Sequence, residues 1–142
     1  MSEQPWGQDV CEVTRDLDNV TPSGVRQLVR TLLDGRDGVV VDDAVLVTDE
    51  LVTNAVRHGG PWRTCRLALT NGGATLRIEV IDGATAPPRF RRPDSTGGRG
   101  LVLVDQLASA WGVVRHHHGK TVWAEMTTAA SPVRHLSAAA HH

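Results

Sequence analysis

Two strand-turn-strand patterns in the second half of the chain set strict limits on its fold. Residues 64–70 (TCRLALT) and 74–82 (ATLRIEVID) look like strands and are separated by Asn-Gly-Gly, a strong hairpin signal. Residues 111–118 (WGVVRHHH) and 120–127 (KTVWAEMT) form a second such pair about Gly119. A doubly wound parallel sheet needs a helix between successive strands, and hairpins lack one. The sequence therefore predicts an α+β fold, a two-layer sandwich in which helices cover one face of a mixed or antiparallel sheet.

A strand and an amphipathic helix are expected before these hairpins. Residues 11–18 alternate weakly, which suits a half-exposed edge strand. Residues 21–35 read as a helix with Thr21 as N-cap, Pro22 at the first helical position and Gly35 as its stop. The apolar face of this helix consists of Val25, Leu28, Val29, Leu32 and Leu33.

Two further helices are predicted. The first follows Val41, with Asp42 or Asp43 as N-cap, and ends at the glycine pair 59–60. Its inward-packing positions are expected to be Val45, Leu46, Leu51, Val52, Ala55 and Val56. The second spans residues 100–112, with Leu101, Val104, Leu107 and Ala108 on one face. Between the two, prolines, arginines and glycines over 83–100 predict a long loop of the kind that forms lids.

The length and composition bound the class of protein. A chain of 142 residues fits one domain, here placed at 9–128, with disordered tails at 1–8 and 129–142, the latter ending in a histidine pair typical of a tag remnant. A formal net charge of -1 gives no electrostatic reason to expect a nucleic acid or an anionic membrane as partner. No apolar run approaches the ~20 residues of a membrane span, so a cytoplasmic location is expected.

Neither the cysteines nor the histidine run is typical of a metal site. Cys11 and Cys65 lack the paired spacing of a zinc or redox motif, which indicates buried free thiols in a reducing compartment. Consecutive residues of a strand point to alternating faces, so His116, His117 and His118 cannot converge on one ion.

Polar side chains interrupt the helix predicted to end at residues 59–60. Glu50, Asn54 and His58 follow one another at intervals of four residues and share a stripe, flanked by Asp49 and Arg57. A carboxylate one turn from a carboxamide can hold a hydrated Mg²⁺ ion and orient a hydroxyl group. From the spacing alone, the solvated face of an amphipathic helix remains the alternative.

Two more patterns suggest ligand contacts. Asp82 ends a strand, where its carboxylate could accept a hydrogen bond from an exocyclic amine such as that of adenine, although Asp-Gly is equally a turn signal. The run TGGRGL (96–101) leads into a helix, so its backbone N–H groups and Arg99 could cradle phosphates. A glycine cluster is also compatible with a flexible hinge.

The three patterns fit one ligand, because a metal ion, an adenine and phosphates together make Mg²⁺–ATP. The runs DELVTNAVRHG, IEVIDG, GGRGLVLVDQLASAWGV and GKTVWAEM, in this order, closely resemble the small bacterial anti-sigma-factor and serine kinase branch of the GHKL ATPases. That family shares the Bergerat ATP-binding fold of the histidine kinases. The resemblance runs from about Asp9 to Thr127, nearly the whole predicted domain.

The resemblance implies roles for individual residues. Glu50 would be the general base that activates the attacking hydroxyl, and Asn54 the Mg²⁺ ligand. Asp82 would bind the adenine amine, and Gly83 would permit close approach of the base. The further ATP-binding residues implied are Gly98, Arg99, Gly100, Leu101 and Thr121, with Thr121 near the adenine. The chain departs from the D-x-G-x-G pattern because the second glycine after Asp82 is missing.

The function implied is an anti-sigma factor with serine/threonine kinase activity, which transfers the γ-phosphate of ATP to a STAS-type anti-anti-sigma partner. The same residues fit a non-catalytic ATP-gated protein that sequesters a sigma factor or another regulator. Glu50 favours the kinase, because binding alone needs no base. Phosphorylation of histidine in trans ranks lower, because no linked dimerisation helix is found. The resemblance also suggests a homodimer formed through the first strand and helix.

Overall fold

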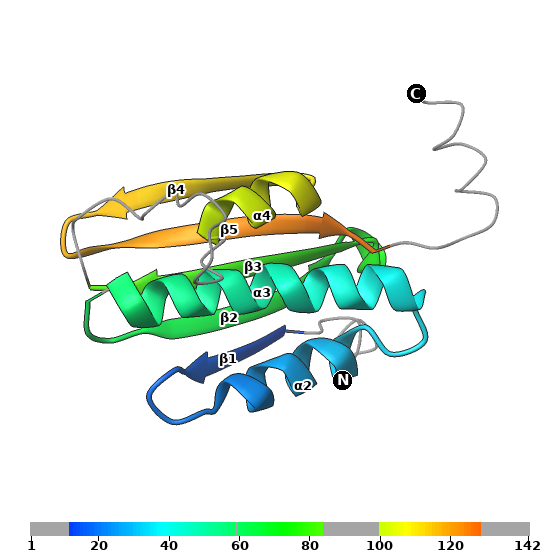
Figure 1. Cartoon of the computed structure of the whole chain (residues 1–142), viewed down its shortest axis with the longest axis horizontal. Coiled ribbons are helices and arrows are strands. Elements are labelled where there is room, and N and C mark those ends of the chain that lie inside the picture. The colour runs from blue at the N-terminus through cyan, green and yellow to red at the C-terminus, as the bar shows by residue number, and fades with distance from the viewer. Residues whose placement is uncertain (1–11, 59, 84–99, 129–142) are drawn as a thin grey trace, which may run out of the picture.

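The fold consists of an antiparallel sheet, and the described helices of the chain all lie on one face of it (Figure 1). The computed structural model describes residues 12–58, 60–83 and 100–128. In sheet order the strands are β1 (Glu12–Asp16), β2 (Thr64–Thr70), β3 (Thr75–Asp82), β5 (Gly119–Thr127) and β4 (Ala110–His116). The helices are α2 (Pro22–Leu32), α3 (Gly38–His58) and α4 (Gly100–Leu107), and the short 3-10 helix η1 (Asn71–Gly73) joins β2 to β3.

The predicted α+β two-layer fold is confirmed, and every described strand pairing is antiparallel. Both predicted hairpins form, and β1 is an edge strand that pairs with β2. The predicted tails and most of the predicted loop, residues 84–99, lie outside the described residues. In the described part of the chain, none of the helices combines the length and the apolar character that crossing a membrane requires.

Side-chain alternation separates an apolar face of the sheet from a polar one. Along β3 every second residue is buried, beginning with Leu76 and Ile78 and ending with Asp82. Along β5 the buried positions are again every second residue from Lys120 to Met126. Because directly paired residues of adjacent strands point to the same side, both sets face the helices.

The α2 helix forms as its sequence predicts. The Thr21 side chain accepts a hydrogen bond from the backbone N–H of Gly24 at 2.9 Å, and Pro22 opens the helix. The helix ends at Leu32, slightly before the predicted stop, and the chain then turns through Gly35 at a φ of 87°. The predicted apolar face is confirmed: Val25, Val29 and Leu33 are buried, and Leu28 and Leu32 pack beside them.

The α3 helix differs from its prediction at its start and on one side. It begins at Gly38 rather than after Val41, because the Asp37 side chain accepts a hydrogen bond from the Val39 N–H at 2.8 Å and so acts as the cap predicted for Asp42 or Asp43. The expectation that Leu46 and Val56 pack inward is wrong, since they are 45% and 50% exposed. The buried stripe is shifted from the predicted one and consists of Ala44, Val45, Val47, Thr48, Leu51, Val52, Asn54 and Ala55.

The α4 helix is shorter than predicted. It ends at Leu107 instead of reaching Gly112, because the following residues join the sheet as β4. Ser109 fixes this change of direction: its backbone N–H and its hydroxyl both donate to the carbonyl oxygen of Glu125 on β5, each at 2.8 Å. Leu101 and Val104 of the predicted face are fully buried.

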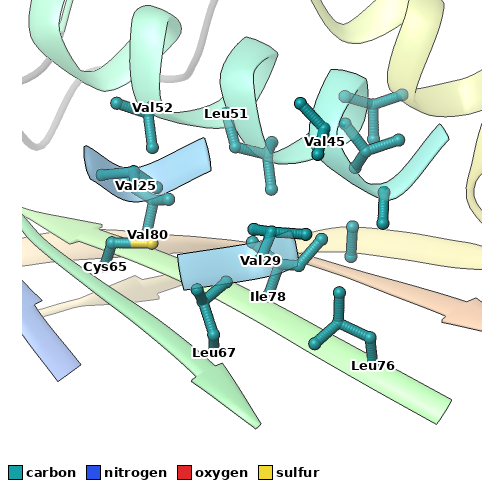
Figure 2. Packing of buried hydrophobic residues seen from close by; sticks show 14 of the residues in the cluster. Val25, Val29, Val45, Leu51, Val52, Cys65, Leu67, Leu76, Ile78 and Val80 are labelled. Atoms are coloured by element: carbon teal, nitrogen blue, oxygen red, sulfur yellow. The ribbon is translucent and has the colours of Figure 1, made fainter. Parts of the chain in front are cut away.

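The core lies between the helices and the apolar face of the sheet. Figure 2 shows Val25 and Val29 of α2 and Leu51 of α3 above Leu67 and Ile78 of the strands. The opposite face of the sheet carries ion pairs. Successive pairs join β1, β2, β3 and β5 in the order Glu12, Arg66, Glu79, Arg77 and Glu125.

Cys65 belongs to this core and provides a test of it. Burial raises the pKa of the Cys65 thiol to about 12, whereas an unfolded thiol titrates near ~8.5. Between these values the unfolded chain loses a proton that the folded chain retains. The free energy of unfolding that this group contributes is therefore fully present below pH ~8.5 and falls as the pH rises towards about 12.

We expect the wild-type protein to lose up to about 1.4 kcal/mol more stability per pH unit in this window than Cys65→Ala, which has no thiol at this position. Urea denaturation of both proteins at several pH values measures the difference. Cys11 is present in both proteins, so any contribution of its thiol to the pH dependence of stability is the same in both. Equal slopes in the two proteins would mean that the Cys65 thiol titrates normally.

The start of β5 packs tightly against the end of β3. A Cβ atom placed on Gly119 would overlap the backbone carbonyl oxygen of Asp82. Gly119→Ala should therefore lower the free energy of unfolding by about 1–3 kcal/mol, as overpacking does elsewhere. Gly38→Ala is the matched control, because an added Cβ there meets no atom within 4 Å. Chemical denaturation of both variants checks the contrast, and similar stabilities would refute the close packing.

Candidate functional site

The polar stripe predicted on α3 exists, but its members differ in their surroundings. Asn54 is 6% exposed, and within the described residues its side chain forms no hydrogen bond. Glu50, one turn earlier, is half-buried and has interactions of its own. Asp49 instead pairs with Arg26 of α2 at 3.1 Å, so it joins the two helices. The polar atoms of Asn54 are absent from the buried unpaired atoms of the described residues, so its carboxamide keeps some access to solvent and is a suitable ligand for a cation or a water molecule.

Asp82 connects three parts of the chain. Its carboxylate oxygen Oδ1 accepts hydrogen bonds from the backbone N–H of Gly60, just beyond α3, at 3.2 Å and from Nζ of Lys120, on β5, at 3.1 Å. The Asp82 and Lys120 side chains are only 1% and 3% exposed. The predicted base-binding carboxylate is therefore located beside the end of the helix that carries Glu50 and Asn54.

Gly83 lies in close contact with the segment that follows α3. Its N–H donates to the carbonyl oxygen of Pro61 at 2.8 Å. A Cβ atom on Gly83 would lie 2.9 Å from that same oxygen and 3.1 Å from Cε3 of Trp62. Trp62 is highly exposed and has a φ of 60°, a backbone conformation that bulky residues rarely adopt. Glycine at position 83 is thus required by packing, in addition to the role predicted for it.

Thr121 does not face the same way as Asp82. It is paired with Ile81 of β3, and its hydroxyl lies 2.7 Å from Nε2 of His116. Positions 121 and 120 point to opposite faces of the sheet, so the Thr121 side chain is on the polar face while Lys120 is on the helix side with Asp82. The structure therefore separates Thr121 from the other predicted site residues, because strand alternation turns it away.

The remaining predicted phosphate contacts lie around the start of α4. Gly100 is the first residue of this helix. The Leu101 side chain is 1% exposed and belongs to the hydrophobic core, which leaves only its backbone for a ligand. Gly98 and Arg99 lie outside the described residues.

Sequence reasoning missed Lys120 and Gly60 as neighbours of Asp82. A signal for Lys120 was present, because Val122, Ala124 and Met126 are apolar and mark even-numbered positions as the buried side of the strand. The contact with Gly60 is made by a backbone N–H, which carries no side-chain signal. The argument from strand alternation does not extend to His117 and His118, because β4 ends at His116; His116 contacts Thr121, and the rings of His117 and His118 contact each other in the turn.

Comparisons with known proteins agree with this architecture. The family model described as histidine kinase-like ATPase domain matches residues 13–126. A comparison with curated proteins found no match.

Two of the solved structures that align with this chain are the following. The crystal structure of the RsbU and RsbW domains of Rv1364c from Mycobacterium tuberculosis aligns with a TM-score of 0.63 at 23% identity, over 86% of this chain and 33% of that one. The histidine kinase domain of the blue-light activated histidine kinase from Erythrobacter litoralis EL346 aligns with a TM-score of 0.49 at 20% identity, over 75% of this chain and 60% of that one. The chain thus spans about a third of the length of the first of these structures.

The family match covers most of the chain, including α3 with its polar stripe, the end of β3 and all of α4. The resemblance inferred from the four sequence motifs is therefore confirmed, and the chain belongs to the histidine kinase-like ATPase domain family.

Proposed function

We propose that this domain binds Mg²⁺–ATP and acts as an anti-sigma factor with serine/threonine kinase activity, transferring the γ-phosphate to a STAS-type anti-anti-sigma partner. Membership of an ATPase domain family implies ATP binding. The observation that carries the proposal is the hydrogen bond between the Gly60 N–H and Asp82, because it joins the predicted base-binding carboxylate to the end of α3. Glu50 and Asn54 lie on that same helix.

Each residue has a separate task in this proposal. Asp82 accepts a hydrogen bond from the adenine amine, and the segment 98–101 holds the phosphates with its backbone N–H groups and Arg99. Asn54 would hold Mg²⁺, and its carboxamide, which has no hydrogen bond to the described residues and keeps some access to solvent, fits an oxygen-liganded cation. That cation, when bound, neutralises phosphate charge.

Glu50 is the proposed base. Phosphoryl transfer depends mainly on positioning and charge neutralisation, so one carboxylate that orients and deprotonates the attacking hydroxyl is sufficient protein chemistry. The serine or threonine of the partner supplies that hydroxyl. The proposed partners are cytoplasmic proteins, so the proposal includes a cytoplasmic location. It also includes a homodimer, which light scattering would test.

ATP binding should require both Asp82 and Mg²⁺. We expect calorimetric titration to show ATP binding that weakens by roughly 10–100-fold in Asp82→Asn, since a hydrogen bond to a charged acceptor is lost. Removal of Mg²⁺ should weaken binding to the wild type more than to Asn54→Ala. Asp42→Asn is the control, because Asp42 is an exposed carboxylate near the other end of α3. No binding of ATP by the folded wild type would refute the proposed function.

Phosphate transfer should depend on Glu50. Incubation of the protein with radiolabelled ATP and candidate STAS-domain partners should label the partner, and Glu50→Gln should reduce the rate by about 10²–10⁴-fold while leaving ATP affinity nearly unchanged. Asp49→Asn makes the same change at the neighbouring position, which pairs with Arg26, and should retain transfer.

The labelling experiment also distinguishes a protein kinase from a non-catalytic binding protein. Labelling that persists in Glu50→Gln would mean that Glu50 is not the base. If the wild type binds ATP and retains a sigma factor in an ATP-dependent manner but labels no partner, the non-catalytic binding protein is the correct function.

A further inference from the structure

The ion pair between Lys120 and Asp82 is unusual for its place in the sheet. Lys120 is the only charged residue among the buried positions of β5, where Val122, Ala124 and Met126 otherwise face the helices. It pairs directly with Asp82 across β3 and β5, so the two side chains start from neighbouring points on the same face. Both are almost completely removed from solvent. A buried ammonium group needs a partner, and Asp82 is the partner it has.

The pair occupies one oxygen of the carboxylate that would recognise the base. A carboxylate oxygen offers two lone pairs in its plane, and Oδ1 of Asp82 already accepts from the Gly60 N–H and the Lys120 ammonium group. The Gly60 donor is fixed by the backbone. The lysine donor sits on a flexible stem of four carbons and can move. A third donor that approaches this oxygen must therefore compete with Lys120.

We propose that Lys120 is an internal competitor of adenine: its ammonium group occupies Asp82 when the site is empty, and ATP binding displaces it. The inference rests on the proposed function, in which Asp82 accepts a hydrogen bond from the adenine amine. Lys120 thereby sets the affinity for ATP. It also gives the buried carboxylate a cationic partner in the absence of nucleotide, so neither Asp82 nor Lys120 is an isolated buried charge.

The competition makes a base-specific prediction. The exocyclic amine of adenine is a donor and needs the position that Lys120 holds, whereas the carbonyl oxygen of inosine at the same ring position is an acceptor. Removal of the ammonium group should help adenine only. Lys120→Met keeps most of the apolar stem and removes the charge. We expect it to bind ATP at least about tenfold more tightly than the wild type, without a gain for inosine triphosphate.

Two controls make the result specific. Arg115 on β4 is paired with Lys120 in the sheet and is exposed, so Arg115→Met removes a neighbouring cation without touching Asp82. It should leave both affinities unchanged. Thermal denaturation of each variant without ligand establishes that it is folded. If Lys120→Met does not fold, Lys120→Gln replaces it, because its neutral amide donates more weakly to Asp82 and should give a smaller gain for ATP.

Calorimetric titration of ATP and of inosine triphosphate distinguishes the outcomes. A gain for ATP alone supports the competition. If the wild type binds ATP and Asp82→Asn weakens that binding, but the Lys120 variant binds ATP equally or less tightly, only the competition is overturned. If ATP binds the wild type and Asp82→Asn equally, or binds no variant, the proposed role of Asp82 fails and this inference fails with it. An equal gain for both nucleotides would also overturn the competition, since it would reflect charge alone.

Discussion

The packing of α3 on the central strands is the contact on which the rest of the structure depends. Leu51, Val52 and Ala55 of this helix are buried in the core that Ile78 and Ala124 form from the sheet side (Figure 2). Successive helical residues are separated by about 100° of rotation, so burial of this stripe also fixes where the neighbouring stripe points. Hydrophobic packing thereby orients Glu50 and Asn54.

The ends of the elements are held by polar contacts rather than by the core. Asp82 terminates β3, and its carboxylate reaches the segment after α3 through Gly60 and the start of β5 through Lys120. The missing space for a Cβ at Gly119 and at Gly83 shows how closely these backbones approach. One edge of the domain is thus fixed by a buried charge and by glycines, and this is the edge where the predicted base contact lies.

Much of the fold follows from the sequence because hairpin turns and alternation are local signals. The turn at 71–73, the cap at Thr21 and the apolar face of α2 are all found where the residues predict them. The predicted start of α3 is wrong because two residues could cap this helix. Asp37 and Asp42 are both good caps, and the earlier one is used: Asp37 accepts a hydrogen bond from the Val39 N–H, and Val41 in the added turn packs against the core.

The buried stripe of α3 is shifted from its predicted position for a geometric reason. A helix against a flat sheet buries a limited arc, so apolar residues outside it, such as Leu46 and Val56, remain exposed. The site was predicted in part. The stripe of Glu50 and Asn54 and the terminal position of Asp82 follow from spacing, whereas the pairing of Asp82 with Lys120 depends on strand register, which is a tertiary property.

The buried ion pair is better explained by the site than by the fold. Replacing a buried pair with apolar residues of similar volume is often neutral or stabilising, because desolvation of two charges offsets their attraction. Stability alone would therefore favour an apolar residue at position 120, in line with Val122 and Ala124. A buried carboxylate that serves a ligand needs partners while the ligand is absent, and the ammonium group of Lys120 is one of them. The ion pair between Lys120 and Asp82 thus stabilises the buried carboxylate when no ATP is bound, and it opposes ATP binding. The stability of the free domain and its affinity for ATP are linked through this single contact.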